Sequence, residues 1–105
     1  MIQTIDVFDL KKKLDHATEK IVLIDVRTHG EREEGYISNS IHIPLNELYE
    51  RMSELSSFGT LYFYCKVGGR SHMAAQLFEE DDLPESINVI GGVAAWTLAG
   101  YPLST

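Results

Sequence analysis

The segment CKVGGRS, residues 65–71, places a nucleophilic side chain next to a glycine turn. Cys65 is the only cysteine of the protein, and it directly follows the apolar run LYFY. Gly68 and Gly69 allow positive φ angles and carry no side-chain bulk. A loop of this kind can turn successive N–H groups inward and hold an anion at the start of a helix. In this chain the anion would be the thiolate of Cys65.

Two cations on the same loop add to this effect. Lys66 and Arg70 lie on either side of the turn. An unperturbed cysteine has a pKa of about 8.5, and cations or inward N–H groups commonly lower it to the neutral range or below. Because the thiolate is the nucleophilic form, we predict that Cys65 is a nucleophile. The loop that binds its substrate would then consist of Lys66, Val67, Gly68, Gly69, Arg70 and Ser71.

A plainer interpretation of each residue stays open at this point. Cys65 could be a small buried residue that only ends a strand. Lys66 could be a solvated surface lysine, and Arg70 could pair with one of the many acidic residues. Ser71 could serve only as a helix N-cap. The glycines, the cations and the new helix favour a nucleophile, because a cysteine that merely packs needs none of them.

The composition of the chain limits its class. With 105 residues, of which 44% are hydrophobic and 24% charged, it fits one globular domain spanning residues 1–105. A single cysteine cannot form an internal disulfide, so the core does not depend on an oxidising compartment. The sequence has no long apolar segment, so we expect no membrane contact and a cytoplasmic location. The four histidines lack ligand spacing, so we expect no metal and no cofactor.

The charge distribution favours a small anionic ligand over a nucleic acid. The formal net charge is -7, whereas binding to a phosphate backbone needs a basic surface. No lysine or arginine follows Arg70, although several acidic residues do. Lys66 and Arg70 therefore form a small positive focus in an acidic protein, and such a focus attracts anions. The acidic residues can also serve solubility alone.

Apolar periodicity predicts strands that alternate with helices. The predicted strands cover residues 21–26, 41–43, 61–64 and 87–90, and the predicted helices run from Val7 to Ala17, over 45–55, from near Ser71 to about Glu80, and over 93–99. This alternation is typical of an α/β fold with a mainly parallel sheet and helices on both faces. Ligands of such sheets bind beyond the carboxyl ends of the strands, which is where Asp25 and Cys65 lie.

Two charged residues at the end of the first predicted strand are expected to support the site. Asp25 is placed to accept backbone N–H groups of the following loop. Arg27 is expected to pair with Glu31 and so brace that loop. Trp96 lies on the last predicted helix and is expected to pack that helix into the core.

Four motifs resemble those of the rhodanese family of sulfurtransferases. The loop CKVGGRS resembles the family's active-site loop through Cys65 and the following glycine and arginine. DVRTHGEREEGYI, residues 25–37, is similar to its N-terminal signature, and IHIPL, residues 41–45, resembles the segment that follows. GGVAAWTLAGYP, residues 91–102, is similar to its C-terminal signature. Four motifs in this order over most of the chain form a strong signal.

The resemblance implies a rhodanese-like three-layer α/β fold and a thiosulfate sulfurtransferase activity. A donor such as thiosulfate would give its outer sulfur to Cys65 as a persulfide, and cyanide or a thiol would accept it. A protein sulfur acceptor is a further possible partner. The chain departs from the family pattern at Tyr36, where the family usually has histidine, and at Asn39-Ser40, which replace a common Gly-Ala. These departures bear on substrate preference more than on fold or chemistry.

Other functions within related folds remain as alternatives. A rhodanese-like domain can be a persulfide carrier or a regulatory module without turnover. Cysteine phosphatases and the related arsenate reductases use a similar loop, but the phosphatases place five residues between cysteine and arginine. Here only four residues separate Cys65 from Arg70, and Ser71 stands where a phosphatase has its arginine. A shorter ring suits a single sulfur better than a phosphate group.

Overall fold

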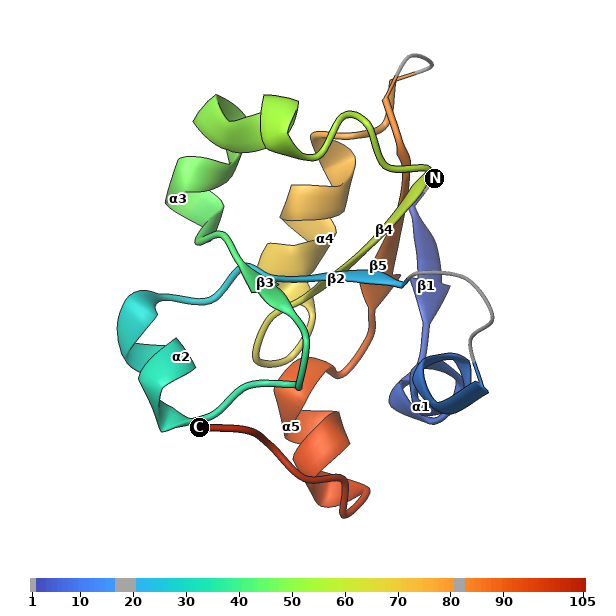
Figure 1. Cartoon of the computed structure of the whole chain (residues 1–105), viewed down its shortest axis with the longest axis vertical. Helices are drawn as coiled ribbons and strands as arrows, with labels where there is room; N and C mark the ends of the chain where they lie inside the picture. The colour runs from blue at the N-terminus through green and yellow to red at the C-terminus, as the bar shows by residue number, and fades with distance from the viewer. Residues whose placement is uncertain (1, 17–20, 81–82) are drawn as a thin grey trace.

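A parallel β-sheet of five strands forms the middle layer of the structure, a computed structural model that describes residues 2–16, 21–80 and 83–105 (Figure 1). The strands are β1 (Gln3–Ile5), β2 (Val22–Asp25), β3 (Ile41–His42), β4 (Thr60–Tyr64) and β5 (Glu85–Val89). Their order across the sheet is β1-β5-β4-β2-β3, and every pair is parallel. All carboxyl ends therefore meet at one edge of the sheet.

Helices cover both faces of this sheet, as the sequence predicted. The helical elements are α1 (Val7–His16), α2 (His29–Glu34), α3 (Leu45–Leu48), the 3-10 helix η1 (Tyr49–Glu54), α4 (Gly69–Gln76) and α5 (Gly92–Leu98). Figure 1 shows α3, η1 and α4 on one side of the sheet and α1 and α5 on the other. The short α2 lies beyond the carboxyl ends of β2 and β3.

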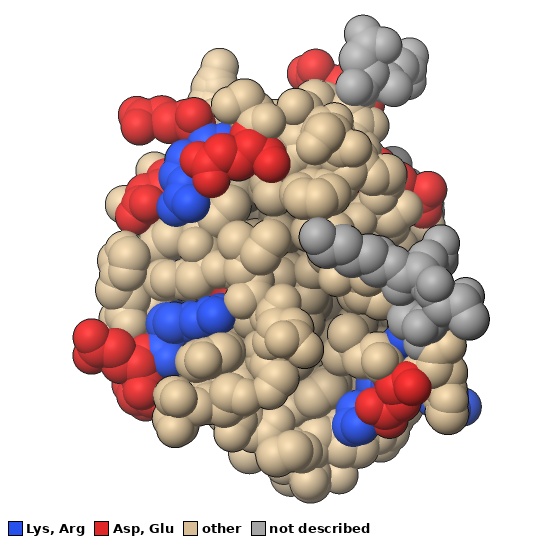
Figure 2. Space-filling model, in the orientation of Figure 1, with Lys and Arg blue, Asp and Glu red and all other residues tan. Residues whose placement is uncertain are grey.

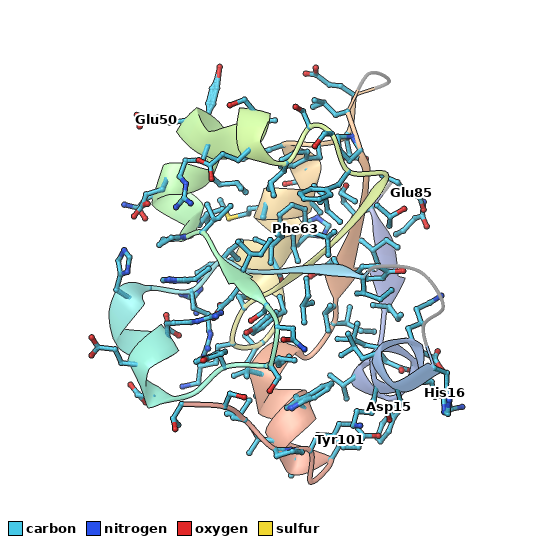
Figure 3. The ribbon with its side chains drawn as sticks, in the orientation of Figure 1. Asp15, His16, Glu50, Phe63, Glu85 and Tyr101 are labelled. Atoms are coloured by element: carbon cyan, nitrogen blue, oxygen red, sulfur yellow. The ribbon has the colours of Figure 1, made fainter. Side chains whose placement is uncertain are left out.

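Two apolar layers separate the sheet from its helices. The layer below α3, η1 and α4 contains Ile24, Phe63 and Phe78, and Figure 3 shows Phe63 in it. The layer toward α1 and α5 contains Leu10, Tyr64 and Trp96, which confirms the expected core position of Trp96. β2 is buried at all four positions because it is a central parallel strand with a helical layer on each side.

Several element boundaries differ from those predicted. Strand β1 was not expected, because three residues with largely exposed side chains carry no strand periodicity. Its backbone is ordered by pairing with β5. The helix after the glycine turn begins at Gly69 rather than near Ser71, and it ends at Gln76 rather than near Glu80. Asp6 caps α1 by accepting the N–H of Asp9, and Ala17 lies outside the described residues.

Charged side chains lie in small groups of mixed sign over the face shown in Figure 2. On α3 and η1, Arg51 pairs with both Glu47 and Glu54, at 3.3 and 2.9 Å. Within the described part of the chain, no helix has the length and apolar character needed to span a membrane.

Candidate active site

The thiol loop, residues 65–71, begins where the central strand β4 ends. Cys65 follows Tyr64, the last residue of β4, and its side chain is 1% exposed. Gly68 has a φ of 114° and is the N-cap of α4, a conformation that other residues rarely adopt. The turn between β4 and α4 thus brings the first residues of α4 next to the sulfur of Cys65.

Backbone N–H groups of the loop point at the sulfur of Cys65. Gly68 donates its N–H to Sγ at 3.1 Å, and Ser71 donates its N–H at 3.4 Å. Ser71 is the third residue of α4, so its N–H is one of the groups that a capping side chain normally binds. The N-cap Gly68 has no side chain, and Sγ takes that place. Ser71 is therefore not the N-cap that the sequence suggested, because the positive φ of Gly68 starts the helix earlier.

These donors set the ionisation of the thiol. Burial raises the pKa of Cys65, because it disfavours the charged form. The Ser71 hydroxyl would act in the opposite direction where its hydrogen points at Sγ, and the N–H groups of Ser71, Gly68 and Val67 do so through their hydrogen bonds. Their sum outweighs burial, and the pKa of Cys65 lies below its ordinary value. A buried thiol that ionises more readily than a free one is a candidate nucleophile.

The N-terminus of α5 binds the backbone of the thiol loop through hydrogen bonds. Val93 donates its N–H to the carbonyl of Cys65, and Ala94 donates to the carbonyl of Lys66, both at 2.9 Å. Gly92 makes this approach possible, since a Cβ there would lie 2.3 Å from the Cys65 oxygen and 2.6 Å from the Lys66 oxygen. The Gly91-Gly92 pair thus contributes to the site through the loop backbone, a contact between segments far apart in the sequence.

Arg70 pairs with Glu31 of α2 through two bonds. Its two terminal nitrogens donate to the Glu31 carboxylate at 2.7 and 2.9 Å. Glu31 also closes a capping box with Thr28 at the start of α2. The pairing with Arg70, and secondarily the bonds from Thr28, lower the pKa of Glu31 to about 2 against the opposing effect of burial. The guanidinium of Arg70 is thus tied to α2, half-exposed beside the thiol loop.

The prediction that Arg27 pairs with Glu31 was wrong. Arg27 instead turns inward and binds Asp25 through its Nε and one terminal nitrogen, both at 3.0 Å. The expectation for Asp25 was right, because it also accepts the backbone N–H of Arg27 at 3.0 Å. Asp25 is fully buried, and Arg32 approaches it at 3.4 Å. A buried carboxylate is stable only with such partners, and Arg27 therefore pairs with Asp25. Glu31 pairs with Arg70 instead.

The remaining predicted loop residues lie at the rim of the site. Lys66 and Val67 are exposed, and Gly69 opens α4. Within the described residues, Lys66 forms no ion pair, so its charge faces solvent next to Cys65. Asp25 and Arg27 brace the chain before α2 and form no hydrogen bond to Cys65 among the described contacts.

One residue of the site was missed by the sequence reasoning. Asn88 of β5 accepts a hydrogen bond from the Ser71 hydroxyl at 2.5 Å and donates to the carbonyl of Gly68 at 3.2 Å. The available signal was a polar residue inside the apolar strand INVI, close to the carboxyl edge of the sheet.

The structure has a five-stranded parallel sheet, and the thiol at the end of its central strand accepts hydrogen bonds from backbone N–H groups of the next loop. This arrangement is typical of the rhodanese-like class of domains. In agreement, residues 7–99 match the family model described as Rhodanese-like domain. The chain belongs to this family, as its motifs indicated.

Named relatives and a solved structure resemble the chain over nearly its full length. A sulfurtransferase of Allochromatium vinosum is 31% identical over 103 residues, covering 98% of this chain and 95% of that protein. The thiosulfate sulfurtransferase GlpE of Coxiella burnetii is 31% identical over 103 residues, covering 98% of this chain and 91% of that protein. A rhodanese-like domain protein from Staphylococcus aureus superposes with a TM-score of 0.86 at 28% identity, covering 99% of this chain and 100% of that chain.

Proposed function

We propose that the protein is a sulfurtransferase that carries a sulfane sulfur as a persulfide on Cys65, and that thiosulfate is a donor. The observation behind this proposal is the buried sulfur of Cys65 with the N–H groups of Gly68 and Ser71 aimed at it. The naming of a similar Coxiella burnetii protein as a thiosulfate sulfurtransferase supports the choice of donor.

In the first half-reaction the Cys65 thiolate attacks the outer sulfur of thiosulfate. A bond forms between Sγ and that sulfur, and the bond between the two sulfur atoms of thiosulfate breaks. Sulfite leaves with the bonding electron pair, so the charge before and after the step is the same. Lys66, exposed at the rim, attracts the dianionic donor.

The product of this step is a persulfide anion on Cys65. The first N–H groups of a helix have no partner within the helix, and those of Gly69 and Arg70 open α4 beside the sulfur. They supply donors for the outer sulfur, in addition to the bonds that Sγ already receives. Positive ends of helices stabilise anions in this way without a metal.

In the second half-reaction a thiophilic acceptor removes the outer sulfur. Cyanide or a thiolate attacks that sulfur, its bond to Sγ breaks, and Cys65 leaves as the thiolate. The donors that stabilise the thiolate also make it a good leaving group. The cycle is thus ping-pong covalent catalysis, and it needs no oxidant or reductant. We include a cytoplasmic location in the proposal, because a reducing compartment keeps a free thiol available.

The decisive experiment is intact mass measurement after incubation with thiosulfate. The reduced protein should gain one sulfur atom, and the variant Cys65→Ser should gain none. Addition of cyanide should then remove the sulfur and release thiocyanate. A failure to form the adduct with thiosulfate or any other sulfane donor would contradict the proposal and favour a regulatory module.

Two alternative functions, a persulfide carrier and a phosphatase, would give different results in the same set of experiments. A persulfide carrier would form the adduct but pass its sulfur to cyanide much more slowly than to a protein acceptor. A phosphatase would hydrolyse an aryl phosphate at a rate that depends on Cys65. We expect hydrolysis at background, because only four residues separate Cys65 from Arg70 and because Glu31 already occupies the Arg70 guanidinium.

A further inference from the structure

A buried amide side chain lies directly behind the thiol loop. Asn88 is 4% exposed and lies opposite Phe63 in the register of β4 and β5. Paired residues of parallel strands point to the same face, so Asn88 lies on the α4 side of the sheet, as Phe63 does. An amide at this place in an apolar layer is costly unless both of its ends are bonded. Both ends are bonded, and both partners belong to the loop.

The carbonyl of Gly68 fixes which way the Asn88 amide faces. Nδ2 lies 3.2 Å from the Gly68 oxygen, which can only accept a hydrogen bond. If the amide were turned over, two oxygens without a hydrogen between them would face each other. Oδ1 therefore points at Ser71, at 2.5 Å from its hydroxyl oxygen. Because Oδ1 is only an acceptor, the Ser71 hydroxyl must donate its hydrogen to Asn88.

This assignment decides how the Ser71 hydroxyl meets the sulfur. The hydroxyl has one hydrogen, and Sγ of Cys65 lies 3.4 Å from the same oxygen. While the Ser71 hydroxyl donates its hydrogen bond to Asn88, it presents a lone pair to Sγ and can accept a hydrogen bond from the S–H group. The hydroxyl can lower the pKa of the thiol only by turning its hydrogen from Asn88 to Sγ. This rotation would leave the buried Oδ1 of Asn88 without a hydrogen-bond donor.

We propose that Asn88 is a positioning residue that holds the hydrogen of the Ser71 hydroxyl away from Cys65. The proposal concerns Cys65, the residue to which the proposed function assigns the persulfide. It rests on that function only for the biological purpose of the control, and not for the hydrogen-bond geometry. Thiolate stabilisation is left to the backbone N–H groups. An overstabilised thiolate is a weaker nucleophile, so a restrained hydroxyl keeps Cys65 both ionised and reactive.

Among the residues that the structure describes, few other charges act on this thiol. Lys66 lies on the loop itself, and Arg70 faces it from α4 while bound to Glu31 of α2. Helix α5 has no ionisable residue in its sequence, and the only one in β5 is Glu85, at the opposite end of that strand. None of these groups changes in the variants proposed below.

The test is the pH dependence of alkylation of the reduced protein by iodoacetamide, which reads the ionisation of its single cysteine. Asn88→Ala frees the Ser71 hydrogen for the thiolate, so the pKa of Cys65 should fall by about one unit, the size of one hydrogen bond to a charged group. In Ser71→Ala the pKa should not rise. In the double variant Asn88→Ala/Ser71→Ala, the fall caused by the Asn88 change should disappear.

Ser86→Ala is the matched control. Ser86 is the neighbouring buried polar residue on the same face of β5, and its hydroxyl donates to the carbonyl of Ala75 at 2.9 Å, away from the thiol. It should lower the melting temperature without moving the pKa of Cys65. A comparable pKa change in Ser86→Ala would mean general loosening and would overturn the proposal.

Other results would overturn it as well. A rise of the pKa in Ser71→Ala would show that the hydroxyl donates to the thiolate in the unaltered protein. An equal effect of Asn88→Ala with and without Ser71 would show that the hydroxyl is not involved. If Asn88→Ala fails to fold, the sign of the change in Ser71→Ala decides alone. Alkylation needs no sulfur donor, so these results are independent of whether thiosulfate modifies Cys65.

Discussion

Replacing Gly92 with alanine should force the thiol loop away from the start of α5. The new Cβ would lie 2.3 Å from the carbonyl oxygen of Cys65 and 2.6 Å from that of Lys66. Both obstacles are backbone atoms, which cannot move aside as a flexible side chain can. Gly92 also has a φ of 53°, a conformation that disfavours alanine. The loop must therefore shift, and the bonds from Val93 and Ala94 to these carbonyls are weakened or lost.

The size of the effect follows from these parts. Two backbone hydrogen bonds contribute about 1 kcal/mol each to the free energy of unfolding. The left-handed conformation costs alanine about 1 kcal/mol more than glycine. The total of about 3 kcal/mol is a large share of the 5–15 kcal/mol that stabilises a typical domain. For a domain of this size, it corresponds to a fall in melting temperature of about 12 °C.

Two other glycines provide controls for Gly92→Ala. Gly100 has a φ of 86°, but a Cβ at this residue would meet nothing within 4 Å, so Gly100→Ala should show only the conformational cost. Gly59 has neither constraint, and Gly59→Ala should be close to neutral. Thermal unfolding by circular dichroism gives the ranking, and iodoacetamide reports on Cys65. Equal melting temperatures for Gly92→Ala and Gly100→Ala, with unchanged alkylation, would refute the reasoning.

Three further predictions concern charged residues. The pairing of Glu31 with Arg70 is part-exposed, so Glu31→Gln should cost only about 1 kcal/mol at neutral pH. Because pairing lowers the pKa of Glu31 from 4.5 to about 2, this contribution is present above pH 4.5 and is lost as the pH falls toward 2, so denaturant unfolding of the two proteins should converge in acid. Asp25→Ala leaves the buried Arg27 without its carboxylate and should cost about 3–5 kcal/mol in denaturant unfolding; a loss below 1 kcal/mol would contradict the buried pairing. Lys66→Gln should reduce alkylation by anionic iodoacetate several-fold relative to neutral iodoacetamide at low salt, and an unchanged ratio would remove Lys66 from anion attraction.

The sequence predicted the layers of the fold better than it predicted their boundaries. The apolar runs around Leu23 and Phe63 are long enough to identify buried strands without any tertiary information. Strand β1 has no such pattern and exists because β5 offers it backbone partners. The start of α4 was displaced for a similar reason, since the positive φ of Gly68 and the sulfur of Cys65 together cap the helix.

The position of the thiol loop, between the end of a strand and the start of a helix, could be predicted from the sequence alone. Cys65, the glycines and Arg70 are nearly contiguous, so short-range geometry was enough to predict a thiol beside a helix start. The pairing of charges and the position of the hydroxyl hydrogen depend instead on the tertiary structure. Arg27 and Arg70 both had Glu31 as a possible partner, and the burial of Asp25 settled the choice. Asn88 reaches Ser71 from another strand, because the parallel register brings the carboxyl ends of β4 and β5 together. Such contacts depend on distances between segments far apart in the chain, and local residue patterns do not encode those distances.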